Sequence, residues 1–160
     1  MTLDAGDKAP NFTLPRANGE TFTLADVLGR RAVVLFFYPK DDTPGCTVEA
    51  CTFRDNYEAF VEAGADVVGV SSDSGASHDG FASKHRLPMT LLTDADGKVR
   101  ALYGVKATLG LMPGRATFVI DKAGTIVHVF VSQIRVKSHV EKALAVVKVL
   151  QQPPPAAARP

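Results

Sequence analysis

Two cysteines, Cys46 and Cys51, are the residues whose type and spacing could do chemistry in this chain of 160 residues. Both lie in the stretch PKDDTPGCTVEAC, and Cys46 directly follows the Pro44-Gly45 turn. Cys46 is predicted to open a helix, and a helix start presents unpaired backbone N–H groups and the positive end of the helix dipole. Both features stabilise a thiolate, which is the reactive form of cysteine. Cys46 is therefore a candidate nucleophile.

Cys51 lies five positions further along the same predicted helix. An intact helix would hold the two Cα atoms roughly 8–9 Å apart and the side chains about 140° apart. A disulfide needs Cα atoms within about 7 Å of each other. Either the two thiols never pair, or the first turns of the helix unwind when they do. Taken alone, Cys51 on an apolar helix face also fits a small core residue.

Two other uses of a cysteine pair fit this sequence less well. Structural zinc needs about four protein ligands, and the four histidines, at positions 78, 85, 128 and 139, are not at zinc-finger spacing. A thioredoxin-like disulfide oxidoreductase usually carries C-x-x-C, whereas four residues separate the cysteines here. We therefore expect no metal site.

The composition excludes several partners. The net charge is +1, and 46% of the residues are hydrophobic while 22% are charged. This ordinary balance gives no reason to expect nucleic acid or an anionic membrane as a partner. No apolar run approaches the length of a membrane span, and the N-terminus MTLDAGDKAPNF lacks a secretory pattern. We expect a cytoplasmic protein, where two cysteines are more often catalytic or redox-sensing than structural.

Strands that alternate with helices predict one mixed-sheet α/β domain over residues 1–150. The expected elements are a hairpin around Asn18-Gly19, buried strands over 32–39 and 65–72, helices over about 47–61 and 77–86, a short strand and helical piece over 89–103, a hairpin over 115–131 and an amphipathic helix over 136–150. The apolar face of the 47–61 helix should carry Val48, Cys51, Tyr57, Phe60 and Val61. Residues 151–160 form a Pro/Ala-rich tail that we expect to be disordered.

Three residues could complete a site around Cys46, because a nucleophilic thiolate needs donors for developing charge and shielding from other reactants. Thr43 lies three residues earlier, so its hydroxyl could reach the sulfur or a bound oxygen; it also fits an ordinary helix cap. Pro39 could cover one side of the pocket or merely end the central strand. Arg115 could supply a cation, although local rules favour a solvated arginine at a strand edge.

The motif Pro39-xxx-Thr43-xx-Cys46 matches the P-x-x-x-T/S-x-x-C signature of the peroxiredoxins. The longer run FFYPKDDTPGCTVEACTFRD resembles the Q-type branch, also called bacterioferritin comigratory protein. The stretches LLTDADGKVRALYGV and GRATFVIDKAGTIVHVF resemble later blocks of that branch in the same order. The resemblance spans about residues 5–150. The loop KATLGLMPGR differs from the commoner text, and the Pro-rich tail is an addition.

The resemblance implies a thioredoxin-like fold with a central mixed sheet flanked by helices and an N-terminal hairpin. It implies a thiol peroxidase that reduces hydrogen peroxide and organic hydroperoxides and that needs neither an external cofactor nor a metal. Cys46 would be the peroxidatic cysteine and Cys51 the resolving cysteine of an intramolecular disulfide, with Pro39, Thr43 and Arg115 completing the site. Glu49 and Gly45 would have supporting roles at most, and a Glu in a first helical turn is expected in any case.

The resemblance also implies partners. Thioredoxin, or alternatively glutaredoxin, would reduce the disulfide, and we expect a monomer or a weak dimer. A different class of function uses the same residues: a redox sensor that passes its disulfide to a client. Steady turnover with peroxide would indicate the enzyme, and one stoichiometric oxidation would indicate the sensor.

Overall fold

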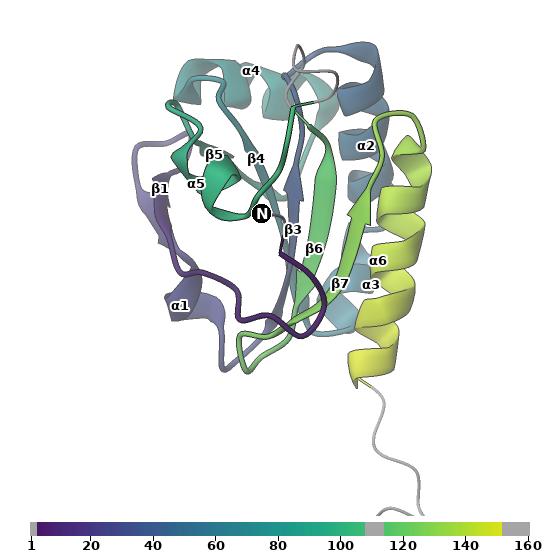
Figure 1. Cartoon of the computed structure of the whole chain (residues 1–160). Helices are drawn as coiled ribbons and strands as arrows, with labels where there is room; N and C mark the ends of the chain where they lie inside the picture. The colour runs from purple at the N-terminus through teal and green to yellow at the C-terminus, as the bar shows by residue number, and fades with distance from the viewer. Residues whose placement is uncertain (1–2, 108–113, 152–160) are drawn as a thin grey trace, which may run out of the picture.

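The computed structural model describes residues 3–107 and 114–151 of the chain. Figure 1 shows its elements, which in chain order are β1 (Thr13–Pro15), β2 (Thr21–Thr23), α1 (Leu24–Val27), β3 (Ala32–Phe37), α2 (Pro44–Asp55), α3 (Tyr57–Glu62), β4 (Ala65–Ser71), α4 (Gly75–His85), β5 (Thr90–Thr93), α5 (Lys98–Leu102), β6 (Ala116–Ile120), β7 (Ile126–Val131) and α6 (Val136–Gln151).

A five-stranded mixed sheet forms the centre of the fold. The strand order is β5-β4-β3-β6-β7; β3 pairs in parallel with β4 and antiparallel with β6. Every residue of β3 is buried, which explains its unbroken apolar sequence, because a strand covered on both faces needs no polar alternation. The predicted mixed α/β architecture is therefore confirmed, as is the N-terminal hairpin formed by β1 and β2.

Helices and the hairpin cover opposite faces of this sheet. One apolar cluster combines sheet residues with α2, α3, α4 and α6, and the other combines the alternate sheet residues with the hairpin, α1 and α5. Figure 1 shows α2 starting at the same end of the molecule as α4, next to the carboxyl end of β3. The buried sheet thus fixes the position at which the cysteine-bearing helix begins.

The predicted helix over residues 47–61 is wrong in its bounds and in its apolar face. It starts earlier, at Pro44, and Asn56 divides it into α2 and α3. The Asn56 side chain donates to Thr52 O at 2.8 Å, and its backbone leaves the helical region, as expected of a residue that competes for backbone hydrogen bonds. Val48 and Val61 are exposed instead of buried.

Two expectations fall partly beyond the described ranges. Positions 108–113 of the unusual loop and positions 152–160 of the tail lie outside them, while α6 continues to Gln151, one residue past the expected end of the domain. Within the described ranges, no helix has the length and apolar character needed to cross a bilayer.

Candidate active site

Cys46 occupies the third position of α2, in its first turn. Thr43 is the extended N-cap residue, and Pro44 is the first helical residue, where the fixed φ of proline suits a helix and its missing N–H costs nothing. The first intrahelical bond runs from Thr47 N to Thr43 O at 2.8 Å. Residue Cys46 is 2% exposed. Cys46 therefore belongs to the turn whose backbone N–H groups lack intrahelical partners, and it lies in a mostly desolvated place.

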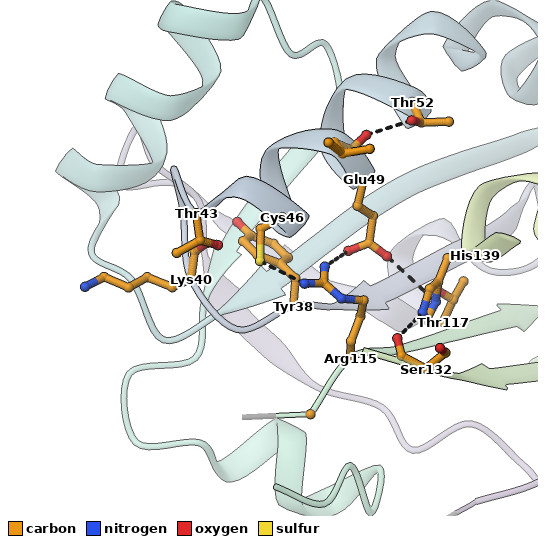
Figure 2. A network of polar contacts seen from close by, with 12 residues as sticks. Tyr38, Lys40, Thr43, Cys46, Glu49, Thr52, Arg115, Thr117, Ser132 and His139 are labelled. Carbon is orange, nitrogen blue, oxygen red and sulfur yellow. Dashed lines mark hydrogen bonds and ion pairs between the residues drawn. The ribbon is translucent and has the colours of Figure 1, made fainter. Parts of the chain in front are cut away.

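Arg115 reaches the Cys46 sulfur from the strand side. Its Nη2 lies 3.4 Å from Cys46 Sγ, and its Nη1 donates to Glu49 Oε1 at 2.7 Å. Figure 2 shows the guanidinium between the sulfur and the carboxylate. Burial lowers the pKa of Arg115, but Glu49 and Cys46 outweigh it and raise that pKa above its ordinary value. The alternative of a solvated arginine is therefore wrong, because Arg115 is a buried cation.

Two glycines allow this approach. A Cβ on Gly45 would lie 3.1 Å from Arg115 Nη2, so a larger residue would push the guanidinium away. A Cβ on Gly114 would lie only 2.1 Å from the Lys106 carbonyl oxygen, and the backbone just before Arg115 could not run where it does. Gly45 thus supports the site by leaving room.

Glu49 belongs to a buried network of polar side chains. Its position is therefore not explained by the general preference for acidic residues near the start of a helix. It is fully buried, one turn after Cys46 on the same face of α2. Its Oε2 has no hydrogen-bond partner among the described residues and lies 3.7 Å from His139 Nδ1. His139 Nε2 donates to Ser132 O at 2.7 Å, so Nδ1 can accept from Thr117 Oγ1 at 2.8 Å. Burial lowers the pKa of His139 to about 4 and so keeps it neutral.

Glu49 therefore has one strong partner, Arg115, and an otherwise apolar or neutral environment. Burial raises the pKa of Glu49 from 4.5 to about 7, although Arg115 opposes the shift. Above that pH, the Glu49 carboxylate is ionised, and it shares the Arg115 guanidinium with the Cys46 sulfur. The carboxylate holds the guanidinium in place while its other nitrogen faces the sulfur.

We predict that Glu49→Gln makes the free energy of unfolding less dependent on pH. Because the folded pKa is raised above the unfolded value, the stabilisation from Glu49 is fully present below pH 4.5 and is lost as the pH rises through about 7. Gln keeps an acceptor for Arg115 but cannot ionise. In urea unfolding of reduced protein, wild type should lose on the order of 3 kcal/mol relative to the variant between pH 4.5 and pH 8. Glu58→Gln, at an exposed position of α3, is the control, and a profile of Glu49→Gln that stays parallel to wild type would contradict the prediction.

Pro39, Thr43, Gly45 and Arg115 line one cavity of about 780 Å³. Thr43 Oγ1 donates to Lys40 O at 2.8 Å and accepts no cap hydrogen bond from α2. The residue therefore has the backbone position of a helix cap, while its hydroxyl lies at the cavity. To donate a hydrogen bond to a ligand oxygen in the cavity, the Thr43 hydroxyl must first break its hydrogen bond to Lys40 O. The sequence-predicted site residues, Cys51 apart, are thus brought together at one end of the sheet.

Cys51 is half-buried in the interior of α2, and both cysteines are free thiols in the described structure. An intact helix separates their Cα atoms by roughly 8–9 Å. The structure therefore represents a reduced form in which the two sulfurs cannot bond.

Arg100 is a site neighbour that sequence reasoning missed. Its Nη1 donates to Gly114 O at 2.6 Å and its Nη2 to Tyr38 O at 2.9 Å. These carbonyls precede Arg115 and Pro39, so one side chain ties together the two strand ends that carry the site. The sequence signal is only an arginine in a short helix, and nothing local distinguishes it from a solvated one.

A buried thiol at a helix start, held against a buried guanidinium at one end of a thioredoxin-like sheet, defines a thiol-based redox enzyme. Residues 5–129 match the model of the AhpC/TSA family. The chain is 47% identical to the chloroplastic peroxiredoxin Q of Triticum aestivum, over 147 residues that cover 91% of this chain and 67% of that protein. The chain therefore belongs to the AhpC/TSA family, among the Q-type peroxiredoxins, and is a thiol peroxidase.

Solved structures agree with this assignment. Peroxidoxin BcpB from Mycobacterium tuberculosis superimposes with a TM-score of 0.85 at 40% identity, covering 92% of this chain and 97% of that one. The Xanthomonas campestris bacterioferritin comigratory protein, studied for alkyl peroxide reduction, gives a TM-score of 0.80 at 32% identity, covering 88% and 92%. The plant relative is named for the chloroplast, and the cytoplasmic location expected for this chain stays a prediction.

Proposed function

We propose that Cys46 is the peroxidatic cysteine of this enzyme and Cys51 its resolving cysteine, and that thioredoxin restores both thiols. The contact of Arg115 Nη2 with Cys46 Sγ, at 3.4 Å, is the observation that carries the proposal. It joins a nucleophile, a cation and a helix start beside a cavity, with Glu49 fixing the cation.

In the first step the Cys46 thiolate attacks the terminal oxygen of a hydroperoxide. The S–O bond forms as the O–O bond breaks, which leaves a sulfenic acid on Cys46 and an alkoxide that takes up a proton and departs as the alcohol. Arg115, Thr43 Oγ and the N–H groups of the first turn stabilise the charge that develops on the two oxygens. These donors bind the transition state more strongly than the ground state, which accelerates the reaction.

In the second step the Cys51 thiolate attacks the Cys46 sulfur. An S–S bond forms, the S–O bond breaks, and the hydroxide leaves as water after protonation. A dithiol protein then reduces the disulfide by thiol–disulfide exchange. Thioredoxin is the proposed donor, with glutaredoxin as the alternative.

Hydrogen peroxide and organic hydroperoxides are the proposed substrates. The cavity beside Arg115 is large enough for an organic substituent, and Pro39, Pro44 and Ile134 give it apolar walls. The alkyl peroxide reduction studied in the Xanthomonas campestris relative supports this substrate class.

A coupled assay tests the function. Full-length protein with thioredoxin, thioredoxin reductase and NADPH should consume NADPH steadily on addition of hydrogen peroxide or cumene hydroperoxide. Consumption that stops after one equivalent per protein would instead support a redox sensor. Replacing thioredoxin with glutaredoxin, glutathione and glutathione reductase identifies the donor.

We predict that the oxidised protein loses helix between Cys46 and Cys51. The first turn of α2 opens most easily, because a terminal turn has the fewest intrahelical bonds. Hydrogen exchange should show amides 47–54 losing protection in the disulfide form, while amides of β3 stay protected. Equal protection in both forms, with the Cys46–Cys51 bridge confirmed by mass, would contradict the unwinding step.

A further inference from the structure

We propose that Asp41 and His78 form a buried positioning pair that fastens the β3–α2 loop (residues 38–43) to α4 and thereby sets how readily the first turn of α2 opens. The inference rests on the proposed disulfide step and goes beyond it, because it assigns the control of that step to residues outside the catalytic cavity. Neither residue touches the Cys46 sulfur.

The Asp41 carboxylate is the centre of the contact. It is 6% exposed, and its Oδ1 accepts from the Tyr38 hydroxyl at 2.6 Å. Its Oδ2 accepts from Ser77 Oγ at 2.9 Å and lies 2.8 Å from His78 Nδ1. Burial and Asp41 raise the pKa of Tyr38 well above its ordinary value, so Tyr38 remains a hydroxyl donor. One loop side chain thus binds two residues of α4.

The partners of His78 determine where a proton must lie. His78 is fully buried, and its Nε2 lies 2.9 Å from Leu92 O. A carbonyl only accepts, so Nε2 carries a hydrogen. Nδ1 and Asp41 Oδ2 at 2.8 Å would repel if both presented lone pairs; hence a second proton lies between them. The contact is therefore a short hydrogen bond between two buried groups, and removing one partner of a buried pair is strongly destabilising.

The acidic cluster around His78 is explained by hydrogen bonds within the protein and needs no metal ion. Asp41, Asp73 and His78 have potential ligand atoms within 4.8 Å of one another, but each already has protein partners. Asp73 Oδ2 accepts from Ser71 Oγ at 2.6 Å and from Asp41 N at 2.8 Å. The backbone of the loop is therefore fastened to the end of β4 as well as to α4.

The fastened loop leads directly into the turn that must open. Asp42 has a φ of 62°, in the left-handed region that Asp adopts more readily than most residues. Thr43 follows and accepts the first hydrogen bond of α2. Unwinding that turn to bring Cys46 to Cys51 pulls on residues 41–43. A firm loop therefore favours the reduced, peroxide-reactive form, and a loosened loop favours disulfide formation.

The adjacent carboxylate supplies a matched control. Asp42 also contacts α4, through Lys84 Nζ at 3.2 Å and His85 Nε2 at 3.3 Å. These contacts are exposed to solvent, where ion pairs contribute little. Asn tolerates the left-handed conformation, so Asp42→Asn removes the same charge from the same loop without disturbing the buried pair.

The test compares Asp41→Asn with Asp42→Asn in the full-length protein. Stopped-flow measurement of a peroxide pulse gives the second-order rate of Cys46 oxidation and the first-order rate of disulfide formation. We expect Asp41→Asn to speed disulfide formation roughly tenfold, which corresponds to about 1.4 kcal/mol, and to slow Cys46 oxidation. Asp42→Asn should change both by less than twofold. Equal behaviour of the two variants overturns the proposal.

A spectroscopic measurement on wild type does not depend on a variant folding. The proton between His78 Nδ1 and Asp41 should give a downfield imidazole resonance in the reduced protein, assigned by ¹⁵N-histidine labelling. It should shift or vanish in the disulfide form. If mass spectrometry confirms the Cys46–Cys51 bridge and the resonance is unchanged, the role of the Asp41–His78 pair is overturned, while the proposed disulfide step stands. If peroxide-treated wild type forms no Cys46–Cys51 bridge, the proposed disulfide step is overturned, and the role of the Asp41–His78 pair is overturned with it.

Discussion

Cys46→Ser is expected to abolish peroxidase turnover, by roughly 10³-fold or more, because a serine hydroxyl stays protonated at neutral pH and cannot replace the thiolate. The oxygen is smaller than sulfur and fits the same buried position, so the fold should persist. The coupled assay with thioredoxin measures the loss, and the circular dichroism spectrum and thermal midpoint check the fold. Turnover that survives the substitution would place the nucleophile elsewhere.

Cys51→Ser separates the two cysteines. This variant should undergo the first oxidation without turning over, because no second thiol can resolve the sulfenic acid. Mass spectrometry should find the sulfenic acid or its higher oxidation states on Cys46. An unmodified Cys46 in this variant, with peroxide consumed, would contradict both assignments. The pair of variants therefore distinguishes loss of the nucleophile from loss of recycling.

The sequence predicted the elements whose signals are local. Continuous apolar runs identified β3 and β4, and Asn18-Gly19 identified the N-terminal turn, because these patterns depend on burial and turn geometry within a few residues. The helix after Cys46 was harder. The Pro44-Gly45 pair is predicted to form a turn, whereas Pro44 is in fact the first helical residue. The break at Asn56 depends on a side chain that bonds Thr52 O, a competition that hydrophobic periodicity does not reveal.

The site shows the limit of local rules more clearly. Glu49 counts as a polar residue in any helical pattern, yet it is fully buried, because Arg115, 66 positions away, compensates its charge. His78 is likewise buried by a partner 37 positions away. Local rules would have left Arg115 in solvent, and only the resemblance to the peroxiredoxins indicated it. Such long-range side-chain pairs form only when the fold brings distant segments together, and the residues adjacent to each position in the sequence do not reveal this.

Arg115→Met is expected to lower the second-order rate of Cys46 oxidation by about 10²–10³, the usual effect of removing one donor that stabilises transition-state charge. Arg115→Lys should restore little of the rate. Its single ammonium cannot contact both Cys46 Sγ and Glu49 Oε1, which the two terminal nitrogens of the guanidinium do at once.

Arg115→Met also leaves Glu49 buried without a partner, so a slow variant could be merely unstable. Removing one member of a buried pair costs about 3–5 kcal/mol. The double variant Arg115→Met/Glu49→Gln removes the stranded carboxyl group and should recover most of the unfolding free energy while the rate stays low. Recovery of the rate together with the stability would show that Arg115 acts only through the fold. A rate that stays 10²–10³ below wild type in a stable protein means that Arg115 acts on the reacting sulfur and peroxide oxygens.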